Sequence, residues 1–523
     1  MIGSIQVVRS PRYWFVTLVL LACVPATWAA SPLDAGDMRW LNRLTYGVSP
    51  ATGQAYQSQG RADYLQDQLQ YTGDMGVPAA VRTQIDAREV SRLALPDLLV
   101  EMRSAAQQIR ATDDPAEKTA LKKAFRQRGM ALAQQAAERH VLRALYDDNQ
   151  LQEQLTWFWF NHFNVFQRKA NISWLVGDYE DHAIRPHVLG KFRDLVFATL
   201  THPAMLDYLD NAKNAAGAVN ENYARELMEL HTLGVNGGYS QADVQALARI
   251  LTGVGIDVAG KGCARGETQL PGVAASITSA TLCFRAARHD SSAKRFLGQE
   301  FPAGGGADEV VRAVNLLTRQ PATAQFVSRQ LAVYFLGDNP PQGVVDAMAR
   351  RFSQSDGDIA QTLDTLFHSA AFQTAPAKFK DPVQYVFSSM RLAYGTQPIV
   401  NPRPVLNWLN QLGEPLYGHL APDGYGLRQS DWLSADQMSK RFDVANALVR
   451  SGGLLYSDAE AAPADTRQQA RRVARLAHPL DVNAMRITLQ PLLSDKTQAV
   501  LEHATNPDER ASLLLSSPDW MYR

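Results

Sequence analysis

Helical periodicity recurs along most of this 523-residue chain, whereas the alternation of apolar and polar residues that marks strands is scarce. Long runs of good helix formers fill residues 115–150. Further helical patterns run through 37–47, 307–319, 321–337, 343–353, 358–368, 382–394, 435–450 and 464–476. Since the chain is also long enough to bury a large core, we predict a mainly α fold, a multi-helix globular domain.

One segment interrupts the helical pattern. Residues 254–305 are rich in Gly, Ala, Ser and Thr, which predicts a small irregular or β-hairpin insert. The insert separates an N-terminal helical block, 31–253, from a C-terminal helical block, 306–523. A second loop-rich stretch, 412–432, contains four Gly and two Pro residues and lies within the C-terminal block.

The first 29 residues have the pattern of a signal peptide for the general secretory (Sec) route. Arg9 and Arg12 precede an apolar run over residues 13–24, and small residues before Ala30 predict cleavage after Ala29. This predicts a periplasmic or secreted protein. In the alternative interpretation the segment is a lipoprotein signal, with Cys23 as the lipidated residue.

Two cysteines, Cys263 and Cys283, are left after cleavage, and both lie in the insert. In an oxidising compartment a lone pair of cysteines is more often a disulfide than a metal or redox site. We therefore predict a Cys263–Cys283 disulfide, with two buried free thiols as the alternative.

The charge balance limits the classes of partner. The chain has 52 basic and 52 acidic residues, so nothing points to nucleic acid or to an anionic membrane surface. Beyond the signal peptide, no segment reaches the roughly 18 apolar residues of a transmembrane helix. We expect no membrane span.

Residues 220–239 concentrate the polar chemistry of the chain. Four ionised side chains, two asparagines and a histidine fall within about three helical turns, from a capping Asn220 to Gly234. On a regular α-helix one face would carry Glu221, Asn222, Arg225, Glu226, Glu229 and Thr232, and His231 would lie at the centre of the apolar side. A capping signal, Ser240 with Asp243, begins the next helix.

This charged face has two interpretations. In the structural one, Glu221, Arg225 and Glu229 form a ladder of ion pairs four residues apart that faces water. In the functional one, Glu226 is a general acid or base. Asp210 or Glu229 would then be its carboxylate partner, and Arg225 would orient the substrate or stabilise charge.

Other polar residues stand in apolar surroundings and need partners. The apolar run 155–164 contains Asn161, His162 and Asn164. They are either hydrogen-bonded core residues or one wall of a pocket. The predicted binding residues are His162, Asn164, His202, Asn211, Asn222, His231, His289 and Asp290.

The sequence contains none of the common metal- or cofactor-binding motifs that we looked for. The sequence has no H-E-x-x-H, no E-x-x-H and no calcium-binding loop, although several ligand-type residues occur. It also lacks a G-x-S-x-G turn, a P-loop and a Rossmann glycine fingerprint. We predict no cofactor and no metal site, and a metal-dependent oxidoreductase is the weakest hypothesis.

The residues above resemble a known family. The resemblance lies in residues 220–253 and in the strings 43–47, 159–163, 204–211, 284–298, 380–382, 422–425 and 517–520. This pattern is similar to the bacterial domain-of-unknown-function family 1800, and it covers nearly the whole mature chain. Gln320 stands where members often have histidine.

The resemblance implies an exported, mostly helical protein. Members are commonly encoded beside a second exported family similar to sulfatases and phosphatases, and the resemblance brings no agreed mechanism. Our first hypothesis is an enzyme that acts on a cell-surface or extracellular polysaccharide by carboxylate acid/base chemistry. The alternative is a non-catalytic envelope binding or assembly protein that partners an exported sulfatase- or phosphatase-like protein.

Overall fold

A computed structural model describes residues 33–257, 269–457 and 466–523, and all of these belong to one compact unit that begins at Leu33. The predicted signal peptide, Cys23 and Cys263 lie outside the described residues. Helices account for most of the described chain, and its strands form only two small sheets, which confirms the mainly α prediction.

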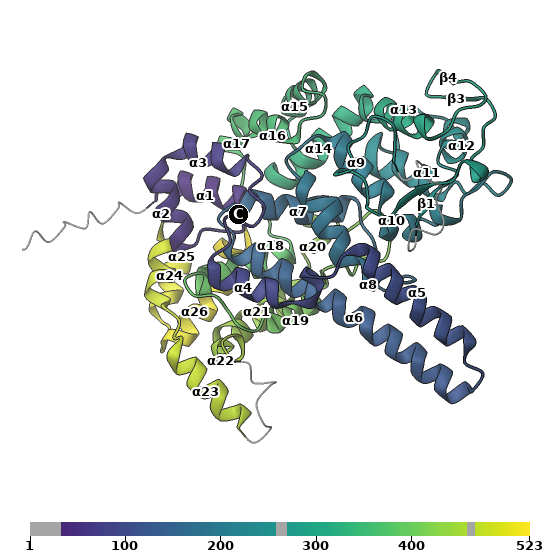
Figure 1. Cartoon of the computed structure of the whole chain (residues 1–523). Coiled ribbons are helices and arrows are strands. Elements are labelled where there is room, and N and C mark those ends of the chain that lie inside the picture. The colour runs from purple at the N-terminus through teal and green to yellow at the C-terminus, as the bar shows by residue number, and fades with distance from the viewer. Residues whose placement is uncertain (1–32, 258–268, 458–465) are drawn as a thin grey trace, which may run out of the picture. The chain divides into compact units, whose positions relative to one another are not determined.

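The helices before the insert are laid out as follows (Figure 1). They are α1 (Ala35–Leu44), α2 (Pro50–Gln59), α3 (Arg61–Gln68), α4 (Ala79–Ala87), α5 (Leu95–Ala111), α6 (Pro115–Tyr146), α7 (Gln150–His162), α8 (Ile172–Asp178), α9 (Phe192–Thr201), α10 (Pro203–Tyr208), α11 (Asn222–Glu226) and α12 (Gln241–Ile250). Two segments are π-helices, η2 (Tyr179–Ile184) and η5 (Leu227–Thr232), which continue α8 and α11.

The helices after the insert match the predicted patterns closely. They are α13 (Ala307–Thr318), α14 (Pro321–Leu336), α15 (Gln342–Gln354), α16 (Ile359–Phe367), α17 (Ala370–Thr374), α18 (Pro382–Tyr394), α19 (Arg403–Leu412), α20 (Gln429–Trp432), α21 (Ala435–Arg450), α22 (Gly452–Leu455), α23 (Arg467–Ala477), α24 (Val482–Leu489), α25 (Asp495–Glu502) and α26 (Pro507–Ser516). All seven helical patterns predicted beyond residue 306 contain a helix.

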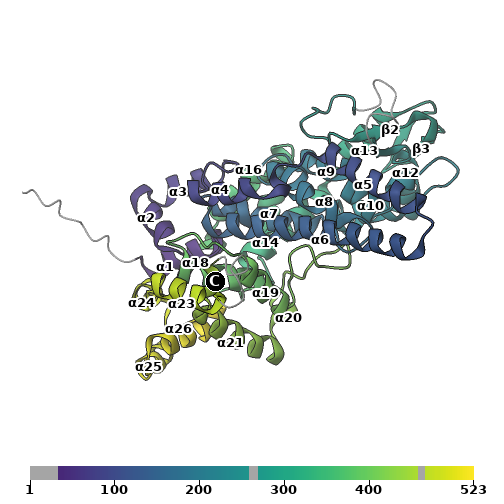
Figure 2. The ribbon, with the colours of Figure 1, turned by 60° about the horizontal axis from the view of Figure 1, so that its bottom comes forward.

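The longest helix, α6, shows how the sequence sets both a helix and its surroundings. Asp114 caps it by accepting hydrogen bonds from the amides of Ala116 and Glu117, and Pro115 occupies its first turn. Its first turns are largely exposed and project beside α5 (Figure 1), whereas Phe125 already contacts Trp174 of α8. The same helix pair is seen from another side in Figure 2. The second half of α6, from Arg139 to Tyr146, is buried.

The core is centred on α7, which is buried from Gln150 to Asn161, and the apolar run that begins at Leu155 predicts this burial for its second half. Helix α18, from beyond the insert, is buried along nearly its whole length as well. The Gln384 amide donates to Oε1 of Gln154 at 2.6 Å, which joins these two helices. The helical blocks on either side of the insert therefore share one core.

All four strands of the described residues lie in the insert. Strand β1 (Val254–Ile256) pairs antiparallel with β2 (Leu282–Phe284), and β3 (Lys294–Phe296) pairs antiparallel with β4 (Gln299–Phe301). Leu297 and Gly298 join β3 to β4 with φ values of 48° and 77°, the left-handed geometry that a two-residue hairpin turn requires. The predicted β-hairpin character of 254–305 is thus confirmed.

Cys283 is fully buried in β2. Because Cys263 lies outside the described residues, the Cys263–Cys283 disulfide stays a prediction.

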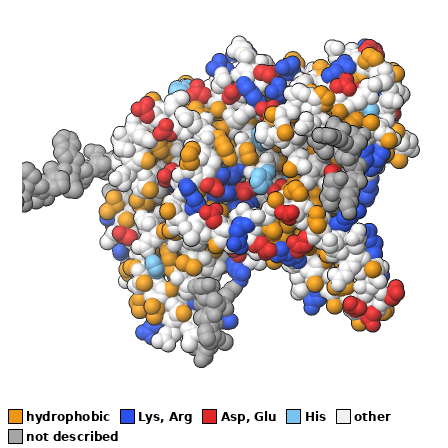
Figure 3. Space-filling model, viewed as in Figure 1, with side chains coloured by type: hydrophobic (Ala, Val, Ile, Leu, Met, Phe, Trp, Pro, Cys, Tyr) orange, Lys and Arg blue, Asp and Glu red, His pale blue; other side chains and the backbone are white. Residues whose placement is uncertain are grey.

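The surface mixes charges of both signs with apolar side chains, as Figure 3 shows for one face. Among the helices of the described residues, none combines the length and the apolar character that a bilayer crossing needs.

Candidate active site

Residues 220–234, here called the motif, do not form a regular α-helix. The helix begins as α11 and continues as the π-helix η5, in which the Leu233 amide donates to the carbonyl of Met228, five residues earlier, at 2.9 Å. The Thr232 hydroxyl likewise donates to the Leu227 carbonyl at 2.6 Å, and Thr232 is fully buried. The predicted place of Thr232 on the charged face is therefore wrong, because a π-turn rotates the later residues. Segments of π-helix are frequent at functional sites.

Both ends of this helix are fixed by residues that the sequence singled out. Glu221 occupies the capping position, and the Oδ1 atom of Asn220 accepts from the amide of Asn222 at 2.9 Å, so Asn220 acts one position earlier than predicted. Gly234 has a φ of +78°, and a Cβ there would lie 2.8 Å from the Phe326 ring. Ser240 and Asp243 form the predicted capping box of α12.

The ladder of ion pairs on the charged face is present. Arg225 contacts Glu221 at 3.2 Å and Glu229 at 3.4 Å, and all three side chains are partly exposed. Arg225 also donates to Gln241 of α12 at 2.9 Å, and Gln241 donates to Glu221 at 2.7 Å. These contacts hold Arg225 along its own helix and tie α11 to α12.

Glu226 differs from its neighbours on that face. It is half-buried, and within the described part of the chain its carboxyl has no hydrogen bond and no ion pair. Burial raises the pKa of Glu226, the negative charges of Glu229 and Asp423 raise it further, and Arg225 opposes them. Glu226 therefore holds a proton to a higher pH than an ordinary glutamate.

Tyr208 and Asp423 belong to the surroundings of Glu226. Burial and the charges of Asp423 and Glu226 raise the pKa of Tyr208 to about 12. Asp423 is 62% exposed, and its Oδ1 atom lies 3.1 Å from Nε2 of His419. The charges of Glu226 and Asp423 thus act on Tyr208, although more than 200 positions separate Tyr208 from Asp423. These three residues are here called the Glu226 cluster.

Polar residues at the end of α7 and just beyond it hold the loop that carries Asp423. The Asn164 amide donates to the carbonyls of His419 at 3.1 Å and Ala421 at 2.7 Å. The Asn161 amide group and the backbone of Tyr425 bond in both directions, at 2.9 and 2.6 Å.

Two further contacts fix the same loop. The Tyr208 hydroxyl donates to the Leu420 carbonyl at 2.7 Å. Gly424 has a φ of +71°, and a Cβ there would lie 2.2 Å from the carbonyl oxygen of Asn161. Only glycine fits so close to another backbone, so the Pro422–Tyr425 turn is pressed against the end of α7.

Asp210 and Asn222 border the same cluster. Asp210 has a φ of 60° and forms an ion pair with Lys169 at 3.3 Å, while Nζ of Lys169 lies 5.1 Å from the Tyr208 ring. The Asn222 amide donates to the carbonyl of Leu209 at 3.3 Å. Asn211, by contrast, is buried and bonds to the carbonyls of Leu251 and Val254 at 3.4 Å, so it ties α10 to the insert.

His162 and His231 are core residues behind the motif. Nε2 of His162 lies 3.0 Å from the His231 carbonyl, so it donates there and carries the ring proton. The His231 ring is fully buried, 4.9 Å from the Phe163 ring, and its nitrogens have no partner among the described residues. Burial lowers the pKa of His162 to about 4 and holds that of His231 well below its usual range, so both are neutral at pH 7.

His202 is a structural cap. Its Nδ1 atom accepts from the amide of Ala204 at 3.1 Å, so Nε2 carries the proton and donates to Asp178 at 2.9 Å. Burial alone would raise the pKa of Asp178, but hydrogen bonds from His182 and His202 outweigh it and lower the pKa to about 2.

His289 and Asp290 lie apart from the Glu226 cluster, beside the insert. Nε2 of His289 lies 3.2 Å from the buried carboxyl of Glu309, and Lys294 contacts the same oxygen at 2.6 Å. Asp290 pairs with Arg249 of α12 at 2.8 Å. Both residues fasten the insert to neighbouring helices.

Sequence reasoning missed a buried ionic network, here called the arginine network. Its members are Arg139, Arg143 and Arg185 with Asp74, Asp147, Glu153 and Asp181. Arg185 contacts Glu153 at 2.6 Å and Asp147 at 3.2 Å, and Arg139 contacts Asp181 of η2 at 2.8 Å. Burial and the charge of Glu153 raise the pKa of Asp147 to about 8.

Neighbouring contacts join the arginine network to the loop of Asp423. Oε2 of Glu180 lies 3.0 Å from Nδ1 of His140 and accepts from the Tyr417 hydroxyl at 2.9 Å. Tyr417 has a φ of 58°, unusual for a residue other than glycine. No spacing marked the network in the sequence, whereas Tyr208 and Asp423 stood in strings that resemble the family.

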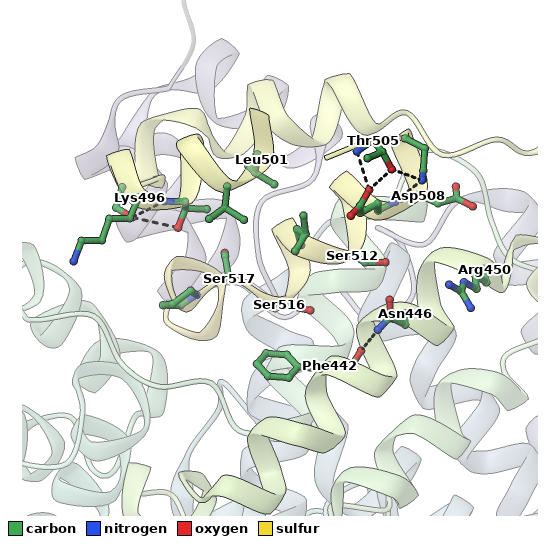
Figure 4. Close-up of a pocket in the computed structure, with 17 residues that line it drawn as sticks. Phe442, Asn446, Arg450, Lys496, Leu501, Thr505, Asp508, Ser512, Ser516 and Ser517 are labelled. Atoms are coloured by element: carbon green, nitrogen blue, oxygen red, sulfur yellow. Dashed lines mark hydrogen bonds between the residues drawn. The ribbon is translucent and has the colours of Figure 1, made fainter. Parts of the chain in front are cut away.

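A large cavity lies elsewhere. It measures about 1130 Å³ and is lined by residues of α21, α25 and α26, among them Phe442, Asn446 and Ser512 (Figure 4). It includes none of the predicted site residues. In the part of the chain that the structure describes, no three His, Cys, Asp or Glu side chains are grouped so that they could hold a metal ion.

Comparison with known proteins adds one finding. Residues 39–522 match the family model described as "Protein of unknown function (DUF1800)". No curated protein and no solved structure matches the chain.

Proposed function

Since the chain belongs to the DUF1800 family, whose description assigns no activity, we propose its function from the site alone. The protein is an exported enzyme that acts on a cell-surface or extracellular polysaccharide by carboxylate acid/base chemistry. Glu226 is the general acid, and Asp423 is the second carboxylate. Glycoside cleavage uses such a pair of carboxyl groups, one protonated and one ionised.

One observation carries this proposal: Glu226 is a half-buried carboxyl with no partner among the described residues, and its pKa is raised. Asp423 is mostly exposed, with His419 as its neighbour. Two carboxyls in such different surroundings separate into an acid and a base. The two partners suggested by the sequence suit the role less, because Lys169 pairs with Asp210 and Arg225 pairs with Glu229.

The test is the variant Glu226→Gln, which keeps the shape of the side chain and removes its proton chemistry. We expect a loss of about 10²- to 10⁴-fold in turnover, the usual contribution of a general acid. Turnover is followed on a panel of polysaccharides as new reducing ends for hydrolysis and as absorbance of unsaturated products for elimination.

The matched control is Glu221→Gln, which makes the same chemical change on the same helix and should leave turnover within about twofold. Circular dichroism and the melting temperature confirm that both variants fold. Full activity of folded Glu226→Gln would contradict the assignment.

Export is the second part of the proposal, and residues 1–29 support it by their sequence. N-terminal sequencing of protein from the periplasm or medium should begin at Ala30. A mature chain that begins at an acylated Cys23 would indicate the lipoprotein alternative, and a retained Met1 would contradict export. Mass spectrometry without reduction tests the Cys263–Cys283 disulfide in the same sample.

A second candidate is a non-catalytic envelope protein that partners an exported sulfatase- or phosphatase-like protein. It draws support from Arg225, Asn161 and Asn164, whose polar groups tie helices and loops together. In that case the motif serves stability, so loss of the Asn161 and Asn164 side chains would lower the melting temperature, and Glu226→Gln would cause no loss of turnover.

A further inference from the structure

A cleft of about 890 Å³ lies between the exposed half of α6 and the segment that leads into α8. Residues from α19 and from the start of the Asp423 loop, Pro415 and Leu416, complete its walls. Its volume is in the range of small-molecule binding sites. The cleft includes none of the residues that the sequence predicted for the site.

The lining of this cleft is positively charged. Lys122, Arg126 and Arg168 line it, and no aspartate or glutamate does. Lys122 and Arg126 are four residues apart on α6, so they lie on one face of that helix. None of the three cations forms an ion pair or a side-chain hydrogen bond with another described residue, unlike Arg128 nearby, which pairs with Glu89 and Glu101.

The other walls suit a carbohydrate. The rings of Phe125 and Trp174 lie 4.8 Å apart and supply apolar surface. Amide side chains, which can bond to hydroxyl groups, come from Gln134, Gln167, Asn171 and Asn410. Guanidinium groups bind planar anionic groups such as carboxylates through paired hydrogen bonds.

The cleft and the Glu226 cluster share two segments of backbone. Gln167 lines the cleft. Its backbone amide donates to the carbonyl of Tyr417 at 3.1 Å, at the start of the loop that carries Asp423. Arg168 lines the cleft, while the next residue, Lys169, pairs with Asp210 beside Tyr208. The two sites are therefore connected through the backbone of these segments.

We propose that this cleft binds the anionic groups of an acidic saccharide through Lys122, Arg126 and Arg168, which makes an acidic polysaccharide the substrate class. This assignment rests on the proposed function for its link to catalysis. The anionic groups are carboxylates of uronic acids or sulfate esters, and both fit the same cations.

The test measures binding of three probes to the full-length mature protein by calorimetry. The probes are a galacturonic acid hexamer, a sulfated dextran oligomer and a neutral dextran oligomer of similar length. We expect the acidic probes to bind, with affinity that falls as salt rises from about 50 to about 300 mM, and the neutral probe to bind at least about tenfold more weakly. The stronger of the two acidic probes identifies the anionic group.

Arg126→Gln and Arg168→Gln should each weaken binding of the acidic probe by about five- to tenfold. Lys123→Gln is the matched control, because Lys123 is exposed on the same helix and does not line the cleft, so binding should change less than about twofold. Equal binding of the neutral probe, or an equal effect of Lys123→Gln, would overturn the proposal.

Glu226→Gln separates this proposal from the proposed function. It should bind the acidic probe as well as the wild type does and turn it over far more slowly. If the acidic probe binds but no turnover depends on Glu226, the proposed binding site stands and the proposed enzymatic function is refuted. If substitution of Arg126 or Arg168 does not change turnover, the proposed binding site is refuted and the proposed enzymatic function stands.

Discussion

The two π-helices among the described residues, η2 and η5, have similar local geometry and opposite surroundings. Each contains six residues, follows a short α-helix and carries acidic side chains. Around η2, Glu180 is fully buried, and Asp181 lies between Arg139 and Arg143. Around η5, Glu229 shares one partly exposed arginine, and the adjacent Glu226 has no partner among the described residues.

The difference teaches how to tell a structural carboxylate from a chemical one. Burial raises the pKa of both Asp181 and Glu226, but in Asp181 the arginines outweigh burial and hold the pKa well below its usual range. Glu226 faces further negative charge instead, so its pKa stays raised. A paired carboxylate fixes helices, whereas an unpaired one with a raised pKa can deliver a proton.

The largest expected effect is that of Asp181→Asn, which sharpens the structural half of the comparison. Arg139 is almost fully buried, and Asp181 is its one ion-pair partner among the described residues, so the variant leaves a buried charge without its counterion. We expect a loss of about 3–5 kcal/mol in the free energy of unfolding. Urea unfolding measures it, with Glu229→Gln on η5 as the control, and a loss below about 1 kcal/mol would break the comparison.

Lowering the pH should reduce the stabilisation contributed by the region of η2 more than that contributed by the region of η5. The pKa of Asp178, next to η2, is lowered to about 2, so its stabilisation is present above the usual value of about 4 and is lost as pH falls toward about 2. At neutral pH it amounts to about 2 kcal/mol. The raised pKa of Glu226 has the opposite sign, because that contribution is present at low pH and is lost as pH rises.

Unfolding free energies measured between about pH 6 and about pH 3 should therefore fall less steeply in Asp178→Asn than in the wild type, although the variant is less stable at neutral pH. Parallel curves for the two proteins would show that Asp178 is not the group that senses acid.

Gly234→Ala tests how the end of η5 is held. The variant should lose about 1–2 kcal/mol from its left-handed φ and lose more from the contact of the new Cβ with the Phe326 ring. Gly238→Ala is a matched control, since Gly238 also has a φ of +78° but open space around its Cβ position. Equal losses in thermal unfolding would mean that packing against Phe326 has no part in ending the π-helix.

The smallest expected effect is that of Glu221→Gln on stability. Its ion pair with Arg225 is partly exposed, so the free energy of unfolding should fall by only a few tenths of a kcal/mol. Salt should reduce the difference further. A loss above about 1 kcal/mol in urea unfolding would show that this ladder stabilises the fold as the arginine network does, and would contradict the difference between the two π-helices.

Much of the fold could be predicted from the sequence because its signals are local. Helix α21 is capped by Ser434 and covers the predicted range 435–450. The insert revealed itself by its composition, and α7 by an apolar pattern that leaves no face for water. The π-turn of η5 was not predictable, because Thr232 reads as one more polar residue on a regular helix.

In the candidate site, too, local patterns identified some residues, and only the tertiary structure placed the others. Asp210 pairs with Lys169 and Asn222 bonds to Leu209, both beside Tyr208, and the charge of Glu226 raises the pKa of Tyr208. His289 lies apart beside the insert, and His202 is a cap. Asp423 joins the cluster only because Asn161 and Asn164 hold its loop, and no local pattern can show a contact across more than 250 residues.

The sequence by itself determined the helices, the hairpin insert, the family and the helix that carries the motif, because caps, periodicity and composition act over a few residues. Only the tertiary structure decided which carboxylates are paired. The net charge and the motif are the same whether Glu226 faces water, an arginine or Asp423. Pairing depends on which distant chain segments a packed core brings within a few ångströms of each other, and that proximity sets the pKa of each carboxyl and the chemistry open to it.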